Sequence, residues 1–311
     1  MNEKLPCSRR EFFHKTIAFS AAAYGASLLG WPGNLLAQDA AFPDLVAVKN
    51  GEPDVMLDKA MTAIGGMSRF VQKGQTVIVK PNIGWNREPE TGADTNPLLV
   101  KRVIEHCLQA GAKKVYVFDH VIDESAAEKT YAISGIENAA KSAGAIVAPA
   151  HDKKYYQEIE IPNATRLKKT SVHELAFESD VLINVPVLKH HMASSLTIAM
   201  KNLMGIVWDR NDWHAKGLNT CIAEFCLYKK PTLNIVDAYA VTMKNGPHRA
   251  RQEDLDYKKT LLVSTDIVAI DAAATKVFGS DPANISFIKQ AHDLGVGNMN
   301  LDALKIERIA L

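Results

Sequence analysis

The chain has 311 residues, with 36 Lys and Arg against 35 Asp and Glu, and its formal net charge at pH 7 is +1. This length can bury the core of one large α/β domain or of two smaller ones. The balanced charge excludes the strongly basic class of nucleic-acid or acidic-membrane binders, because both need an excess of Lys and Arg.

The first forty residues have the layout of an export signal. Ser8 to Lys15 reads SRREFFHK, and the stretch from Thr16 to Gln38 contains no Asp, Glu, Lys or Arg. A charged segment followed by an apolar one is typical of secretory signals, and the pair Arg9-Arg10 is typical of the twin-arginine route. We therefore expect residues 1–40 to be a twin-arginine signal segment and the twin-arginine translocation machinery to be a partner.

The same segment bears on location and on cofactors. Trp31, Pro32 and Gly33 interrupt the apolar stretch, so we expect no stable membrane span after signal removal. Residues 35–37 match a cleavage site only in part, so whether and where the signal is cleaved stays open. The expected location is periplasmic or otherwise extracytoplasmic. Because this route carries folded proteins, it favours a metal or organic cofactor acquired in the cytoplasm.

The four cysteines predict neither disulfides nor a metal cluster. Cys7 leaves with the signal, and the remaining Cys107, Cys221 and Cys226 are an odd number without a CxxC pair. We expect no iron–sulfur cluster.

From Leu45 onward the sequence alternates strand and helix patterns. Strands are predicted at 45–48, 76–80, 114–119, 145–148, 180–185, 233–237, 261–264 and 304–309, and helices at 56–70, 97–110, 134–143 and 266–278. This alternation predicts a single α/β domain over residues 41–311, with a mainly parallel sheet and helices on both faces. Tyr155–Leu167 alternates polar and apolar residues and predicts a small inserted hairpin.

The stretch 181–205 organises the domain. Its first part, Val181–Leu188, predicts a buried strand and its exit loop, since Pro186 lacks a ladder donor. Lys189, His190 and His191 would then lie in a loop, and the two histidines would point to opposite faces of an extended segment. Ser194 or Ser195 is a plausible cap for a helix with this apolar stripe: Leu196, Ala199, Met200 and Leu203.

Polar residues gather at the carboxyl ends of the predicted strands, where open parallel sheets bind ligands. These residues are Lys80, Asn82, Asp119, His120, Lys189, His190, His191, Asp237 and Asp266. Lys189 and Lys201 are lone cations within apolar sequence, which is unusual for a solvated face and favours an anion site. Asp119 ends a strand as a ribose-binding acid would, but no GxGxxG precedes it, so a nicotinamide site is not supported.

Several ordered motifs resemble the family catalogued as domain of unknown function 362, over roughly Ala47 to the C-terminus. They are VIVKPNIGW, TNP, AGAKKVYVFDH, NVPVLKHH, TIAMKNLMG, NIVDA, NGP and STDIVAIDAAA. The resemblance implies an α/β fold and a set of site positions, but no reaction. The cofactor-binding candidates are Lys80, Asn82, Asp119, Lys201 and its neighbour Asn202.

Two functional hypotheses from different classes follow. The first is an exported enzyme that binds an anionic substrate or cofactor, with Lys189, His190 and His214 as catalytic candidates for acid–base or redox chemistry. The second is a non-catalytic extracytoplasmic binding protein for an anion or a metal complex.

The metal candidates are His190, His214 and Asp237, although no two have ligand spacing. Trp208 and Trp213 beside His214 predict either a lid or burial at a seam. The substrate, the cofactor and the oligomeric state are left open.

Overall fold

The structure is a computed structural model that describes residues 42–311, and Phe42–Leu311 form one compact unit. The predicted export signal lies outside the described residues. Among the described helices, none combines the length and apolarity that crossing a membrane requires.

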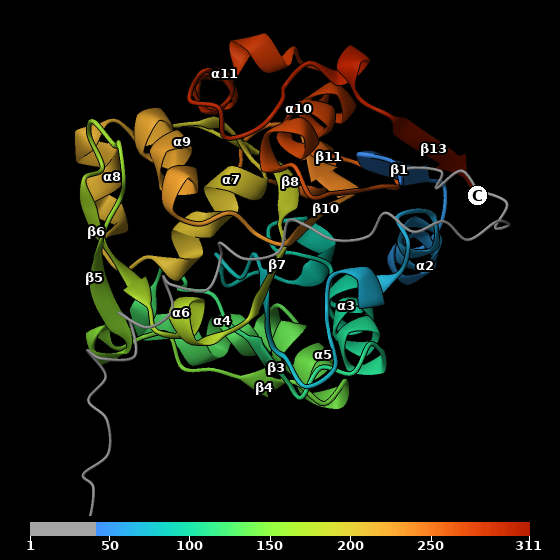
Figure 1. The fold of residues 1–311 in the computed structure, drawn as a ribbon, viewed down its shortest axis with the longest axis horizontal. Helices are drawn as coiled ribbons and strands as arrows, with labels where there is room; N and C mark the ends of the chain where they lie inside the picture. The colour runs from blue at the N-terminus through green and yellow to red at the C-terminus, as the bar shows by residue number, and fades with distance from the viewer. Residues whose placement is uncertain (1–41) are drawn as a thin grey trace, which may run out of the picture. The chain divides into compact units, whose positions relative to one another are not determined.

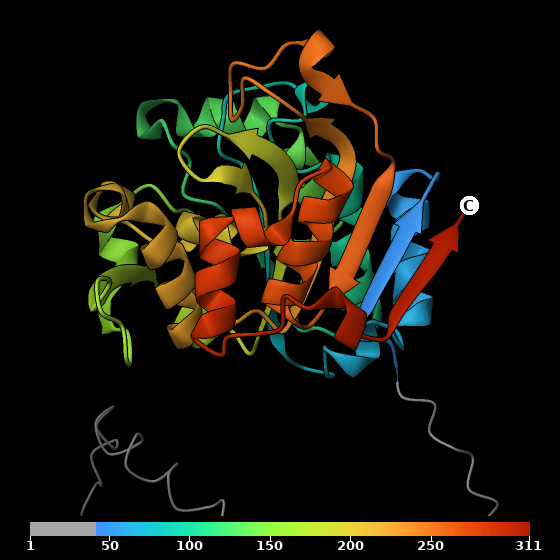
Figure 2. The same cartoon turned by 90° about the horizontal axis from the view of Figure 1, so that it is seen from above.

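The main sheet has eleven strands, with eight of them in the order β13-β1-β12-β10-β7-β2-β3-β4. Their bounds are β1 Leu45–Lys49, β2 Thr76–Pro81, β3 Lys114–Val117, β4 Ile146–Val147, β7 Val181–Val185, β10 Leu233–Thr242, β12 Thr260–Ser264 and β13 Ile306–Ala310. Three short or branching strands join them: β8 Val187–His191, β9 Ser195–Thr197 and β11 Leu255–Asp256. Figure 2 shows β12, β1 and β13 side by side at one edge.

The sheet is mixed but mainly parallel. β7, β2, β3 and β4 pair in parallel, as do β10 with β7 and β1 with β13. Antiparallel pairing is concentrated around β12, which runs against both β1 and β10. The parallel part is buried on both faces, which explains continuous apolar runs such as Val77–Val79.

Helices cover both faces of the sheet, as Figure 1 shows. One face carries α2 Pro53–Ala63, α3 Pro97–Gln109, α4 Ala127–Ile133 and α5 Ile136–Ser142; the other carries α7 Ala199–Asn202, α9 Leu218–Tyr228, α10 Ile267–Phe278 and α11 Ser286–Asp293. The remaining described α-helices are α6 Leu175–Glu178 and α8 Arg210–Lys216. Each face buries its own apolar cluster, so the site-bearing strands are held rigidly between two cores.

Local signals explain where the longer helices start and stop. Asn96 accepts a hydrogen bond from the N–H of Leu98 and caps α3, whose first residue is Pro97. Asp266 caps α10 through the N–H groups of Val268 and Ala269, and Gly279 ends α10 with a left-handed φ of 93°.

The predicted α/β class, mainly parallel sheet and two-sided helical cover are confirmed. The predicted hairpin is also present as a separate two-stranded sheet, β5 Tyr156–Glu160 with β6 Lys169–His173. Its second strand lies later than predicted, because the turn around Asn163 and the segment 165–167 precede it.

The prediction for residues 187–199 was wrong in detail. Residues 187–191 form strand β8 rather than an exit loop, and residues 195–197 form strand β9 rather than the first turn of a helix. β8 pairs with both β10 and β9, so tertiary hydrogen bonding overrides the helical spacing of the apolar residues. Ser195 turns the chain with a φ of 65°, and α7 begins only at Ala199.

Candidate functional site

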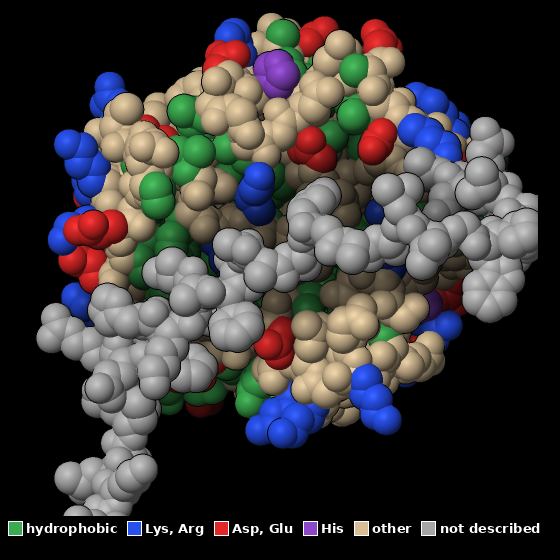
Figure 3. Space-filling model, viewed as in Figure 1, with side chains coloured by type: hydrophobic (Ala, Val, Ile, Leu, Met, Phe, Trp, Pro, Cys, Tyr) green, Lys and Arg blue, Asp and Glu red, His purple; other side chains and the backbone are tan. Residues whose placement is uncertain are grey.

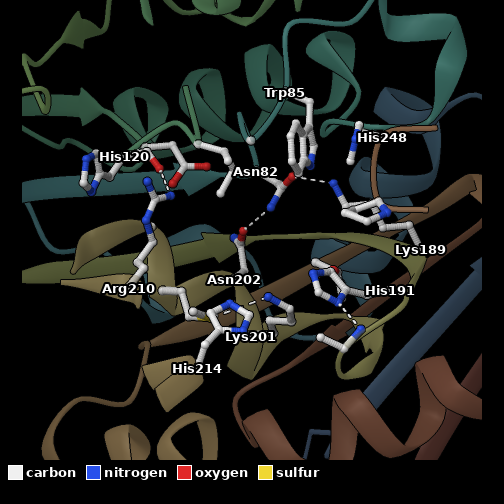
Figure 4. Close-up of a pocket in the computed structure, with 18 of the residues that line it drawn as sticks. Asn82, Trp85, His120, Lys189, His191, Lys201, Asn202, Arg210, His214 and His248 are labelled. Carbon is white, nitrogen blue, oxygen red and sulfur yellow. Dashed lines mark hydrogen bonds between the residues drawn. The ribbon is translucent and has the colours of Figure 1, made fainter. Parts of the chain in front are cut away.

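A cavity of about 410 Å³ opens beyond the carboxyl ends of β2 and β3, beside β8 and under α7 and α8. Figure 4 shows the labelled side chains converging on it from both sides. The charged or titratable lining residues are Lys80, Asp119, His120, Glu124, Lys189, His191, Lys201, Arg210, His214 and His248. The polar strand ends therefore meet at one place, as the rule for open parallel sheets predicts.

Lys80 and Asp119 form a buried ion pair at the floor of the cavity. Nζ of Lys80 lies 2.9 Å from Oδ1 of Asp119, and neither side chain is exposed. Lys80 also donates to the Asn202 side-chain oxygen at 3.0 Å and to the Pro81 carbonyl at 2.8 Å. Burial lowers the pKa of Lys80, and the charge of Asp119 opposes that shift. All three donors of Lys80 thus have partners within the protein.

Gly205 makes room for this ion pair. A Cβ at position 205 would lie 1.6 Å from Oδ1 of Asp119 and 2.6 Å from Nζ of Lys80. The Gly205 carbonyl also accepts the N–H of His120 at 2.9 Å, which ties the turn after β3 to the segment after α7. A glycine is therefore required at position 205 by close approach to charged side chains.

Lys189 is buried beside a carboxyl group that does not itself line the cavity. Its Nζ donates to Oδ1 of Asn82 at 2.9 Å and to the carbonyl of Ala93. Burial lowers the pKa of Lys189 to about 8, against the attraction of Asp94. Burial likewise raises the pKa of Asp94 to about 7, and one of its oxygens has no hydrogen-bond partner within the described protein. The two groups therefore titrate together.

A line of asparagines runs from the cavity into the sheet. The amide of Asn82 donates to Asn202 at 2.9 Å, Asn202 donates to Asn184 at 2.9 Å, and Asn184 donates to Asn234 at 3.0 Å. Because Lys189 donates to the first amide oxygen, every donor in the line points away from the cavity. This network fixes the orientation of Asn82 and Asn202, which hold Lys189 and Lys80.

Lys201 differs from the other two lysines. The sole partner of its Nζ among the described residues is the thioether of Met204 at 3.5 Å, which is a weak acceptor. Burial, together with the nearby cations Lys189, Arg210 and Lys80, lowers the pKa of Lys201 to about 7. Lys201 is thus a half-buried cavity amine without a carboxylate partner in the described chain.

A buried carboxyl group on α10 holds the helix that carries Lys201. The two oxygens of Asp271 accept the N–H groups of Ala199 at 2.7 Å and Met200 at 3.1 Å, at the start of α7. Burial raises the pKa of Asp271 to about 8, although both hydrogen bonds oppose that shift. Asp271 therefore positions Lys201 and Asn202 without lining the cavity itself.

Two histidines lie beside Lys201. His191 accepts the N–H groups of Ala193 at 3.1 Å and Ser194 at 3.4 Å on its Nδ1. Burial, with Lys201 and Lys189 nearby, lowers the pKa of His191 to about 2, so the ring is neutral and carries its proton on Nε2. Burial and Lys201 also lower the pKa of His214, which belongs to α8 and is more exposed.

Arg210 and Trp208 form another part of the wall. Arg210 donates to the carbonyls of His120 and Val121, the latter at 2.6 Å, and has no ion pair within the described residues. The Trp208 ring stacks on the His120 ring with a centroid distance of 4.8 Å. Trp213, by contrast, is fully buried against Phe225 and does not face the cavity. Of the two readings for these tryptophans, burial applies to Trp213, whereas Trp208 lies at the cavity.

Most of the residues predicted from the sequence line this cavity. Those that do are Lys80, Asn82, Asp119, Lys189, Lys201, Asn202 and His214. His190 does not, because alternation along β8 turns it to the other face, where it lines a second, open cavity with Arg249 and Arg251. Asp237 is buried and accepts the N–H groups of Asn96 and Tyr239 instead.

The three metal candidates therefore do not form a common site. His214 lines the first cavity, His190 the second, and Asp237 lines neither. Within residues 42–311, no group of three or more His, Cys, Asp or Glu side chains has the geometry to hold a metal ion.

Sequence reasoning missed several lining residues. Arg210 lies two residues after Trp208 in a segment that the sequence marked only for its aromatic residues and His214. His248 and Trp85 are far apart in the sequence, yet their rings stack with a centroid distance of 4.1 Å. Trp85 follows the end of β2 closely, and this position of an aromatic residue is the one sequence signal that could have identified it.

Comparison with known proteins gives a family and distant structural neighbours. The family model described as Domain of unknown function (DUF362) matches residues 77–276. The Thylakoid-associated protein sll1697 of Synechocystis sp. is 28% identical over 244 residues, which are 75% of this chain and 72% of that protein.

Two solved structures are similar at low identity. The lactate racemase apoprotein from Thermoanaerobacterium thermosaccharolyticum has 11% identity and a TM-score of 0.44, over 80% of this chain and 56% of that one. A protein from Thermotoga maritima has 10% identity and a TM-score of 0.41, over 78% of this chain and 60% of that one. The chain thus spans less than two thirds of either solved chain.

Proposed function

The chain belongs to the DUF362 family, and on that premise we propose that it is an exported enzyme that binds a small anion in the cavity. The anion is a substrate or a cofactor with a carboxylate or phosphate group. The proposed chemistry is proton transfer at the bound anion, with histidine as the acid–base group. Redox chemistry applies if the anion is a cofactor.

The observation that carries this proposal is that the Lys201 amine has no carboxylate partner among residues 42–311. A half-buried lysine without a carboxylate partner costs free energy, because desolvation of its charge is not compensated within the described chain. A bound anion would supply that compensation. Lys189 and Arg210 add positive charge to the same cavity, and within residues 42–311 Arg210 donates only to backbone carbonyls.

The charge distribution supports an anion over a cation. Four cationic side chains line the cavity against two carboxylates, and one carboxylate, Asp119, is already paired with Lys80. On the face in Figure 3, by contrast, acidic and basic side chains are interspersed around the described surface. The cavity therefore has an excess of positive charge, which favours binding of a small anion.

His214 is the proposed acid–base group, and His191 is a proposed hydrogen-bond donor. His214 is partly exposed, lies beside Lys201 and titrates below its usual range, so it is a neutral base near pH 7. The depressed pKa of His191 keeps that ring neutral, with Nε2–H available to a ligand. The cations around them would stabilise negative charge that develops as a proton leaves the bound molecule.

Binding is tested by thermal unfolding of the mature protein in increasing inorganic phosphate or acetate, at constant ionic strength set by chloride. We expect saturable stabilisation, which reaches about 2.7 kcal/mol when the anion is at 100 times its dissociation constant. The matched variants are Lys201→Met and Lys141→Met; Lys141 is exposed and pairs with Glu137 at 2.5 Å on α5. Equal stabilisation of the parent and of Lys201→Met would contradict the proposal.

Catalysis is tested separately from binding. Short carboxylic acids incubated with the protein in deuterated water should gain deuterium beside the carboxylate, and His214→Asn should lose this exchange while it keeps anion binding. Saturable anion binding without exchange in any of the acids would favour a non-catalytic binding protein instead.

A further inference from the structure

We propose that Lys201 is a nucleophile that binds a small anionic aldehyde or α-keto acid covalently, as an imine. This inference rests on the proposed anion site and goes beyond it, because it names the ligand class and assigns Lys201 a bond-forming role. Lys189 and Arg210 would take the carboxylate or phosphate of the ligand, and Lys201 would meet its carbonyl carbon.

The three cavity lysines are not equivalent in geometry. Lys80 is occupied by Asp119, Asn202 and a backbone carbonyl, and Lys189 by Asn82 and a backbone carbonyl. The amine of Lys201 contacts only the Met204 sulfur within the described chain, so its nitrogen is free to approach a ligand. Figure 4 shows this amine between the rings of His191 and His214.

The surroundings favour the neutral form of the Lys201 amine, which is the nucleophilic form. The cations that lower the pKa of this amine are Lys189 of β8, Lys80 of β2 and Arg210 of α8, and the acids that line the same cavity are Asp119 and Glu124. Burial is the largest cause and the three cations add to it, so the pKa of Lys201 falls to about 7. An ordinary lysine titrates near 10.5, so near pH 7 a larger fraction of Lys201 is in the free-amine form. Crowding by like charge and desolvation activate lysine nucleophiles in this way.

The covalent step needs no reagent besides the ligand. The nitrogen lone pair of Lys201 attacks the carbonyl carbon, the C–N bond forms, and the carbonyl π electrons move onto oxygen. A proton moves from nitrogen to that oxygen and gives the carbinolamine. Nitrogen then expels the oxygen as water, with a second proton taken from solvent, and the iminium forms. Nothing is oxidised or reduced, and hydrolysis reverses the sequence.

The positive charge of the iminium would make proton transfer easier at the neighbouring carbon. An iminium attracts electrons from the neighbouring carbon, so a C–H proton there becomes more acidic. His214 lies beside Lys201 and titrates below its usual range, which suits it to accept that proton. The imine thus supplies a physical route to the proton transfer proposed above.

The experiment is reductive trapping with glyoxylate and sodium cyanoborohydride on the mature protein, followed by intact mass and peptide mapping. Reduction of the imine leaves a carboxymethyl group on the lysine. We expect one carboxymethyl group on Lys201, formed at least about tenfold faster than on the exposed Lys153 or Lys168, given the larger free-amine fraction. Acetaldehyde, which lacks the anion, should label Lys201 with much less preference.

Lys201→Arg separates the covalent role from the anion site. Arginine keeps the positive charge but is not a nucleophile near neutral pH. We expect this variant to retain phosphate-dependent stabilisation and to lose the selective adduct. Peptide mapping of the parent protein already shows whether Lys201 is labelled selectively. The test therefore does not require the Lys201→Arg variant to fold.

The outcomes distinguish the two proposals. Selective glyoxylate labelling of Lys201 supports the imine. Phosphate stabilisation together with indiscriminate labelling of lysines overturns the imine and leaves the anion site intact. Absence of both phosphate stabilisation and selective labelling contradicts both proposals.

Discussion

Lys80 and Asp119 end neighbouring parallel strands and form a 2.9 Å ion pair that is almost fully excluded from solvent. Asp119 also accepts the N–H of Ile83 at 2.6 Å, so one carboxylate joins the ends of β2 and β3 at the cavity floor. The pair is therefore a structural support of the cavity floor, even though both of its members line the cavity.

Asp119→Asn should destabilise the protein by about 3–5 kcal/mol, because it leaves the Lys80 ammonium buried without its counter-charge. Urea denaturation at neutral pH measures the loss. Glu128→Gln, at an exposed position of α4, is the matched control and should change stability little. A loss below about 1 kcal/mol in Asp119→Asn would show that the pair is not the support described here.

Gly205→Ala should be destabilising through the same pair, because the new methyl group would overlap the Asp119 carboxylate. Gly84→Ala is the control, since a Cβ there would meet only the Asn82 side chain, at 3.4 Å. In urea denaturation, the double variant Gly205→Ala/Asp119→Asn should lose less stability than the sum of the single variants, because both disturb one contact. Strict additivity would argue against the overlap.

Lys201→Met should leave the ligand-free protein no less stable at neutral pH, and anion binding should weaken by about 1.5–3 kcal/mol. The pKa of Lys201 falls from 10.5 to about 7 on folding, so the unfolded chain binds more protons between these pH values. Parent stability should therefore rise with pH across that window. The difference between parent and variant, from denaturation at several pH values, should show this rise; a flat difference would contradict the lowered pKa.

Metal at the cavity should depend on a bound small molecule, because the described residues provide no protein-only set of ligands. We expect elemental analysis of protein freed of small molecules to give far less than one metal per chain. His214→Ala should lower metal content only in protein that retains its native ligand. Stoichiometric metal in the stripped parent, lost in His214→Ala, would reverse this expectation.

Export should require the arginine pair. With Arg9 and Arg10 both replaced by Lys, the protein should stay in the cytoplasm, because the twin-arginine route reads these two residues. Cell fractionation with an antibody to the mature domain measures the distribution, and replacement of Lys15 by Arg is the control. Unchanged export of the double variant would remove the basis for this route.

The sequence by itself determined the class of the fold and much of the cavity floor. Apolar runs bounded by capping residues are local signals, so the strand before Lys80 and the helices started by Asn96 and Asp266 were predictable from neighbouring residues. The rule that ligands bind beyond parallel strand ends then brought Lys80, Asp119 and Lys189 together.

The tertiary structure alone decided which side chains face the cavity and which charges are paired. Hydrogen bonds from β10 and between β8 and β9 made residues 187–197 a hairpin, and that register turned His191 rather than His190 inward. Contacts between segments far apart in the chain pair Lys80 with Asp119 and leave Lys201 without a carboxylate partner among residues 42–311. Local periodicity carries no information on such contacts, because they are fixed by the packing of whole elements.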